Sequence, residues 1–124
     1  MSAVAVREAR SDERPAVLGV LDGAMLETDR LDGSTLLVAV AGDRVLGALV
    51  LDGDHVDAVA VRRSRRGQGI GTALVEAAAA RRERLVAEFR EGVRPFYESL
   101  GFEVEPTLEE GRFRGVREPR HTGP

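Results

Sequence analysis

The apolar residues of the chain gather in short runs that alternate with polar positions or are rich in β-branched side chains. Three such runs, residues 35–40, 44–51 and 55–61, are separated by Gly42-Asp43 and by Asp52-Gly53-Asp54. Glycine and aspartate between apolar runs favour tight turns. The pattern therefore predicts an antiparallel meander of three strands.

The segment before the meander predicts one strand and one helix. Residues 3–7 have the composition of a short strand, and Ser11 and Asp12 are residue types that cap helix N-termini. Pro15 suits the first turn of the helix that follows. Apolar residues recur there at helical spacing and should form its buried face: Val17, Leu18, Leu21 and Met25.

After the meander, an alanine-rich run predicts a helix over about residues 69–82. Residues 85–89 form a predicted strand, which should lie parallel to residues 55–61 because a helix joins the two. Residues 95–100 predict a short helix that ends at Gly101.

Two more predicted strands, residues 102–105 and 112–116, complete the pattern. The predicted order is β-α-β-β-β-α-β-α-β-β, an α/β fold with a mixed central β-sheet and flanking helices. We expect a single domain over residues 1–117. Residues 118–124 hold two prolines and no apolar anchor, so we expect a mobile tail there.

Composition restricts the chemistry. The chain has 124 residues, a formal net charge of −3, two histidines and no cysteine. These values argue against thiolate chemistry, a histidine metal cage and general nucleic-acid binding. All 18 basic residues are arginine, which excludes a Schiff-base lysine and a lysine-bearing phosphate loop. No apolar run is long enough to span a membrane and no secretory leader is visible, so we expect a cytoplasmic protein.

The most specific signal lies between the third strand of the meander and the alanine-rich helix. Gly67, Gly69 and Gly71 stand where a strand turns directly into a helix, beside four arginines and no acidic residue. Glycines let backbone N–H groups approach an anion, and the helix dipole attracts negative charge. The junction therefore predicts a polyphosphate site. Thr72 stands in place of the third glycine of a Rossmann fingerprint, which argues against that fold.

Two motifs together resemble a known family. Arg66-x-x-Gly69-x-Gly71 is similar to the acetyl-CoA signature of the GNAT N-acetyltransferases, and residues 96–102, Phe-Tyr-Glu-Ser-Leu-Gly-Phe, resemble that family's second landmark. The predicted element order is also the GNAT order, and the resemblance extends over residues 35–116. It implies transfer of an acetyl group from acetyl-CoA directly to a primary amine of an unidentified small molecule or protein, without a metal.

The resemblance also implies roles for individual residues. Tyr97 stands where the family places the acid that protonates the leaving thiolate, and the plain alternative is a core ring. His55 lies eleven positions before Arg66, where one branch of the family has a glutamate base. A water chain is the other candidate base, and a solvated turn residue is the plain alternative for His55. The implied cofactor-binding residues are Val59, Ala60, Val61, Arg66, Gly67, Gln68, Gly69, Ile70, Gly71 and Thr72.

Some features depart from the family pattern. Arg90 replaces an asparagine that often contacts the cofactor arm, and the segment before residue 35 leaves little room for the usual second helix. A non-catalytic CoA-binding sensor or regulatory domain is therefore an alternative, and a pure assembly domain is a third. Glu27, Asp29 and Asp32 would favour a cationic acceptor or are plain loop charges. A homodimer is also open, because dimers are common among similar proteins.

Overall fold

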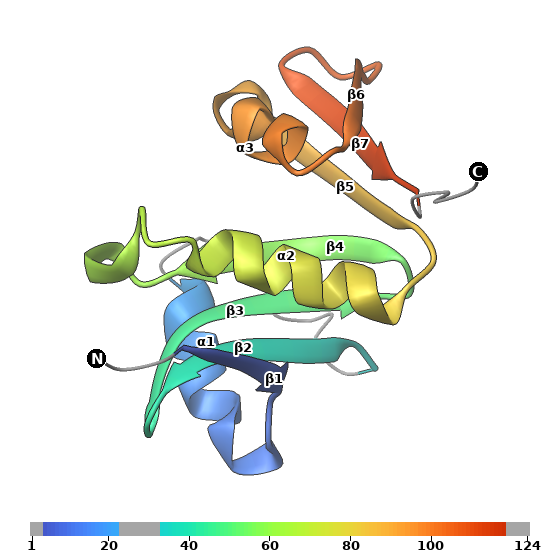
Figure 1. The fold of residues 1–124 in the computed structure, drawn as a ribbon. Helices are drawn as coiled ribbons and strands as arrows, with labels where there is room; N and C mark the ends of the chain where they lie inside the picture. The colour runs from blue at the N-terminus through green and yellow to red at the C-terminus, as the bar shows by residue number, and fades with distance from the viewer. Residues whose placement is uncertain (1–3, 23–32, 119–124) are drawn as a thin grey trace, which may run out of the picture.

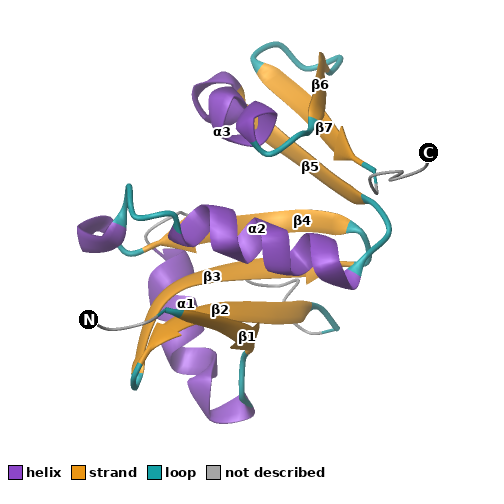
Figure 2. Ribbon diagram, viewed as in Figure 1, coloured by secondary structure: helices purple, strands orange, loops and turns teal. Residues whose placement is uncertain are grey.

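The computed structural model describes residues 4–22 and 33–118, and these residues form a seven-stranded sheet flanked by helices (Figures 1 and 2). The strand order is β1-β2-β3-β4-β5-β7-β6. The strands are β1 Ala5–Glu8, β2 Thr35–Ala41, β3 Arg44–Asp52, β4 His55–Val61, β5 Leu85–Arg90, β6 Glu103–Pro106 and β7 Arg112–Arg117. The α-helices are α1 Arg14–Asp22, α2 Ile70–Arg81 and α3 Arg94–Ser99, and short 3-10 turns are η1 Ser11–Glu13, η3 Arg63–Arg65 and η4 Glu91–Val93.

The predicted fold class is confirmed. Strands β2, β3 and β4 form the predicted antiparallel meander, and β4 pairs with β5 in parallel. The other strand pairs of the described chain are antiparallel, so the sheet is mixed.

Each face of the sheet carries its own core, because successive residues of a strand point to opposite faces. On β3, Leu49 and Leu51 pack under α2, whereas Ala48 and Val50 pack under α1. The side chains of α2 that complete the first core are Ile70, Leu74, Val75 and Ala78. Those of α1 that complete the second are Val17, Val20 and Leu21.

Gly47 on β3 lets α2 pack directly against the sheet. A Cβ atom at this position would lie 3.0 Å from the carbonyl oxygen of Ala60, 3.1 Å from Ile70 Cγ2 and 3.2 Å from Leu74 Cδ1. These separations are tighter than side chains normally accept, so a larger residue would push the helix away. The absence of a side chain therefore holds the first turn of α2 close to the end of β4.

Strand β4 contains a β-bulge. Val50 pairs with Ala58 and Leu51 pairs with Val56, so Asp57 is an extra residue on β4. A bulge changes which face the following side chains reach. Val56 packs on the α2 side, whereas Ala58, two residues later, packs on the α1 side.

The start of the first helix differs from the prediction. The N-cap of the 3-10 turn η1 is Arg10, rather than Ser11 or Asp12, and the carboxylate of Glu13 accepts the Arg10 N–H at 2.8 Å. Arg7 donates to both oxygens of the same carboxylate, at 2.7 and 2.8 Å. The carboxylate of Glu13, which Arg7 of β1 holds in place, thus caps the turn instead of the side chain of Ser11 or Asp12 that the sequence indicated.

Several predictions about segments fall outside the described residues. They concern Met25, the acidic residues Glu27, Asp29 and Asp32, and almost all of the predicted tail, of which only residue 118 is described.

We expect Gly47→Ala to lower the free energy of unfolding by about 1–3 kcal/mol, because the new methyl group forces α2 or the backbone of β4 to move. Gly19→Ala is the matched control. No atom lies within 4 Å of a Cβ at that position in α1, so the substitution should raise stability by about 0.5–1 kcal/mol through helix propensity. Urea denaturation followed by circular dichroism measures both. A Gly47→Ala protein as stable as the unsubstituted one would contradict the packing described for α2.

Candidate active site

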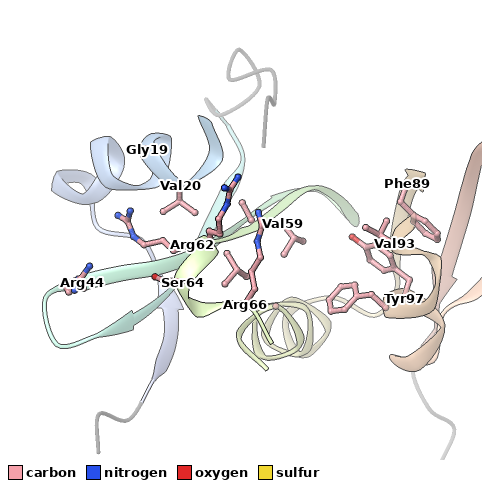
Figure 3. A pocket seen from close by; sticks show the side chains of 15 residues that line it. Gly19, Val20, Arg44, Val59, Arg62, Ser64, Arg66, Phe89, Val93 and Tyr97 are labelled. Carbon is pink, nitrogen blue, oxygen red and sulfur yellow. The ribbon is translucent and has the colours of Figure 1, made fainter. Parts of the chain in front are cut away.

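A cavity of about 830 Å³ opens where β4 and β5 separate (Figure 3). The two strands pair only at His55–Val86 and Val56–Ala87. Beyond that point β5 leads away to α3, as Figure 1 shows. The residues that line the cavity are Gly19, Val20, Arg44, Val59, Ala60, Val61, Arg62, Arg63, Ser64, Arg66, Gly71, Phe89, Val93, Phe96 and Tyr97.

The loop between β4 and α2 forms a second, smaller cavity of about 250 Å³. Gly67 and Gly69 adopt positive φ angles of 81° and 80°, which bulkier residues rarely accept, and Gly69 is the N-cap of α2. Ala73 donates the first intrahelical hydrogen bond, to Gly69, at 3.0 Å. The N–H groups of the preceding helical residues are therefore available to an anion at the positive end of the dipole.

This small cavity, which we call the cradle, contains most of the predicted loop residues. It is lined by Val61, Arg65, Arg66, Gly67, Gly69, Ile70, Gly71, Thr72 and Phe96. Gln68 is not among them, although it belongs to the loop. Val61, Arg66, Gly71 and Phe96 line both cavities, so the cradle and the main cavity adjoin.

The main-chain edge of β4 lies between the cradle and the end of the strand pairing. Val59, Ala60 and Val61 pair with β3 on one side and line the main cavity. In the described part of the chain, no strand pairs with their other edge, because the pairing with β5 ends at Val56. An extended ligand can therefore add to β4 as a strand would.

Tyr97 lies on the opposite wall, in a cluster of aromatic rings. Its ring stacks on Phe89 with centroids 4.4 Å apart and meets Phe96 and Phe102 edge-on, each at 5.1 Å. Only 7% of Tyr97 is exposed, yet it lines the cavity, and Figure 3 shows its hydroxyl directed towards β4. Burial raises the pKa of the Tyr97 hydroxyl to about 12, so the group holds its proton at neutral pH.

Two glycines make this aromatic cluster compact. Gly101 has a φ of 87° and ends α3, which turns Phe102 back so that its N–H donates to the Tyr97 carbonyl at 3.2 Å. A Cβ at Gly115 would lie 3.1 Å from Phe89 Cε1 and 3.3 Å from Phe102 Cβ. The missing side chain on β7 therefore gives both rings room to pack around Tyr97.

The structure does not bring His55 to this cavity. His55 is the first residue of β4, at the closed end of the strand pair, and its side chain is 52% exposed. Its Nδ1 lies 3.0 Å from Asp54 Oδ1 in the preceding turn. His55 and Tyr97 are therefore not on facing walls of one site.

Sequence reasoning missed other features of the site. Gly19 and Val20 of α1 and Arg44 of β3 also line the main cavity. No local motif marks these positions, because they reach the cavity only through the packing of α1 and the β2–β3 hairpin.

Within residues 4–22 and 33–118, no group of three or more histidine, cysteine or acidic side chains is placed to hold a metal ion. In the same ranges no helix is long and apolar enough to cross a membrane.

Solved structures share this fold. A candidate GNAT-family acetyltransferase from Desulfovibrio desulfuricans matches with 20% identity and a TM-score of 0.73, over 94% of this chain and 99% of its own. A candidate N-acetyltransferase from Lactobacillus plantarum matches with 18% identity and a TM-score of 0.78, over 94% and 98%. A candidate streptothricin acetyltransferase from Bacillus anthracis, solved in complex with acetyl coenzyme A, matches with 12% identity and a TM-score of 0.68, over 93% and 95%.

A comparison with curated proteins returns no match. The family model described as an acetyltransferase (GNAT) domain matches residues 32–104, which is more than half of the chain. That segment includes β4, the glycine-rich loop, α2, β5 and α3, which supply most of the lining of both cavities. The chain therefore belongs to the GNAT family of acetyltransferases, as its two motifs indicated.

Proposed function

We propose that the protein transfers an acetyl group from acetyl-CoA directly to a primary amine. The observation that carries this proposal is the continuity of three features: the cradle at the N-terminus of α2, the edge of β4 beside it, and the Tyr97 hydroxyl across the main cavity. The GNAT family uses acetyl-CoA, and the protein from Bacillus anthracis was solved with it.

The residues present fit each part of acetyl-CoA. The diphosphate needs N–H donors and positive charge, which the first turn of α2 and Arg66 supply. The extended arm needs main-chain partners, which Val59, Ala60 and Val61 offer at the cavity. Apolar side chains of Phe89 and Val93 line the far wall, and Phe96 packs against Tyr97 beside them. An uncharged thioester would lie against these side chains. When bound, acetyl-CoA supplies the activated acyl group.

Tyr97 is proposed as the acid of the reaction. Formation of the N–C bond and cleavage of the C–S bond leave a thiolate, which needs a proton or a hydrogen-bond donor. The Tyr97 hydroxyl points into the cavity and keeps its proton, because its pKa is about 12. It can donate to the leaving sulfur and recover a proton from solvent.

Water is proposed as the base that takes the proton of the amine. His55 lies at the closed end of β4, away from the residues that line the cavity. Its exposed position beside Asp54 fits the alternative of a solvated turn residue better than a catalytic role. An amine that reaches the cavity from solvent can lose its proton to water before it attacks.

We expect Gly69→Ala to weaken acetyl-CoA binding about 5- to 30-fold, because a side chain at a φ of 80° costs roughly 1–2 kcal/mol and the loop would leave the binding conformation. Gly71→Ala is the comparison variant. Its Cβ would meet Phe96 and Val61 at 3.5–3.8 Å, which are ordinary contacts, and its φ is not positive. Titration calorimetry with acetyl-CoA should therefore show the larger loss for Gly69→Ala. Equal losses would mean that the backbone conformation at Gly69 does not govern binding.

We expect Tyr97→Phe to lower kcat about 100-fold and to change acetyl-CoA affinity less than about twofold, because the ring stack survives and only the acid is lost. Thiol release with a panel of amines and peptides measures kcat, and calorimetry measures affinity. Similar losses in both would make Tyr97 a structural residue. Binding of acetyl-CoA without thiol release above hydrolysis for any acceptor would instead favour the CoA-binding sensor.

The pH dependence gives an independent check on Tyr97. Its folded-state pKa of about 12 lies above the usual value of 10.0, so the acid keeps its proton throughout the range in which amines become neutral. The kcat of the unsubstituted enzyme should rise as the acceptor deprotonates and should not decline through loss of this acid below about pH 11. A decline centred near pH 8–9 would assign the acid to another group.

A further inference from the structure

The main cavity has a basic wall that the cradle does not use. Arg44, Arg62 and Arg63, which we call the distal arginines, line the main cavity and not the cradle. Arg65 lines only the cradle, and Arg66 lines both. The arginines of this region are therefore divided into two sets, of which one adjoins the N-terminus of α2.

The distal arginines line the main cavity together with residues of α1. Gly19 and Val20 of α1 line the main cavity and are absent from the cradle. The Arg62 backbone N–H donates to the Leu46 carbonyl at 2.8 Å, and its Nε donates to the Val45 carbonyl at 2.6 Å. Val45 belongs to the core beneath α1, whereas the cradle is built on the first turn of α2, on the other face of the sheet. Figure 3 shows Arg44 and Arg62 on the β3–β4 side, across from Tyr97.

The distal arginines differ from several other arginines of the described chain in their ion pairs. Arg7, Arg84, Arg94, Arg112 and Arg117 each form an ion pair with a carboxylate. In the same part of the chain, Arg44 and Arg63 form no ion pair, and the hydrogen bonds of Arg62 go to backbone carbonyls. Neighbouring cations that lack an acid raise the local positive potential and favour an anion between them.

We infer that the acceptor is an amine that also carries an anionic group, a carboxylate or a phosphate, and that the distal arginines bind this group. The inference rests on the proposed acetyl transfer and names its substrate class. At about 3.3 Å per residue, the chain from Val59 to Arg63 covers at most about 13 Å. Arginine side chains shorten that distance, so an acceptor of several bonds can present its amine near Tyr97 and its anion to the basic wall.

The same arginines could instead bind a phosphate of the cofactor, because the chemistry is shared. CoA carries a 3′-phosphate in addition to the diphosphate that the cradle is proposed to bind. The acceptor is varied in the first arm of the experiment and the cofactor in the second. The two possible sources of the bound anion can therefore be told apart.

The first arm compares ω-amino carboxylates of three to eight carbons with the amino alcohols of the same length, in a thiol-release assay with acetyl-CoA. We expect kcat/KM for the best carboxylate to exceed that of its amino alcohol about 10-fold or more. Arg44→Gln and Arg63→Gln should each reduce this ratio several-fold. Arg81→Gln removes an exposed arginine at the end of α2, outside both cavities, and should leave the ratio unchanged.

The second arm repeats the assay with acetyl-3′-dephospho-CoA. A loss of the preference for the 3′-phosphate in Arg44→Gln and Arg63→Gln, with the acceptor ratio unchanged, would assign these arginines to the cofactor and overturn the inference. Equal kcat/KM values for carboxylates and amino alcohols would also overturn it while leaving acetyl transfer intact.

A third measurement does not depend on turnover. Inorganic phosphate is titrated into the CoA-saturated protein, so that the cradle is filled, and into the Arg44→Gln/Arg63→Gln double variant treated in the same way. We expect at least about 10-fold weaker phosphate binding in the double variant. Equal binding in both proteins would refute the anion site. Absence of thiol release with every amine would count against the proposed function alone, and the phosphate titration would then decide the anion site.

Discussion

The structure depends on the early end of pairing between β4 and β5. Two residue pairs join the strands, and then β5 diverges towards α3. Unsatisfied strand edges are costly inside a protein, so a sheet that opens in this way needs a ligand or solvent at the opening. The opening makes the backbone of Val59, Ala60 and Val61 accessible, and it separates the wall of Tyr97 from the wall of the distal arginines. The binding properties of the site follow from that separation.

The two walls differ in electrostatic character, and the fold produces the difference. On the β5 side, Phe89, Phe96 and Phe102 exclude water from the Tyr97 ring, which disfavours tyrosinate and keeps the hydroxyl protonated. On the β4 side, Arg62, Arg63 and Arg66 of the loop after β4 are exposed and line the cavity together with Arg44 of β3. A proton donor and a positive field thus face each other across one cavity, and neither requires a metal or a cysteine.

Much of this could be predicted from sequence because the signals are local. The alternation in residues 35–61 predicted the meander. Gly67 and Gly69 indicated the loop, because only glycine readily adopts the positive φ angles found there. Counting back from Arg66 reaches His55, but the count does not show whether His55 lies in the paired or the open part of β4. That depends on where the pairing with β5 ends. The bulge at Asp57 and the cavity contacts of Gly19 and Arg44 likewise depend on packing between distant segments. The cap at Arg10 depends on Arg7, which β1 holds in place.

The distal arginines also bear on how the amine is deprotonated, because no histidine is among the described residues that line the cavity. A positive potential disfavours an ammonium ion and lowers its pKa, so an amine beside arginines that have no ion pair within the described residues would lose its proton more readily than in water. An anionic group on the same molecule would bring the amine close to the arginines. Its negative charge would also lower the positive potential there. In the proposed reaction the distal arginines bind the anion and the arginines of the cradle bind the diphosphate, so little of this positive potential remains for the amine. We therefore assign the deprotonation to water in the proposed reaction, since the one buried titratable group among the described residues that line the cavity is Tyr97, which acts as the acid.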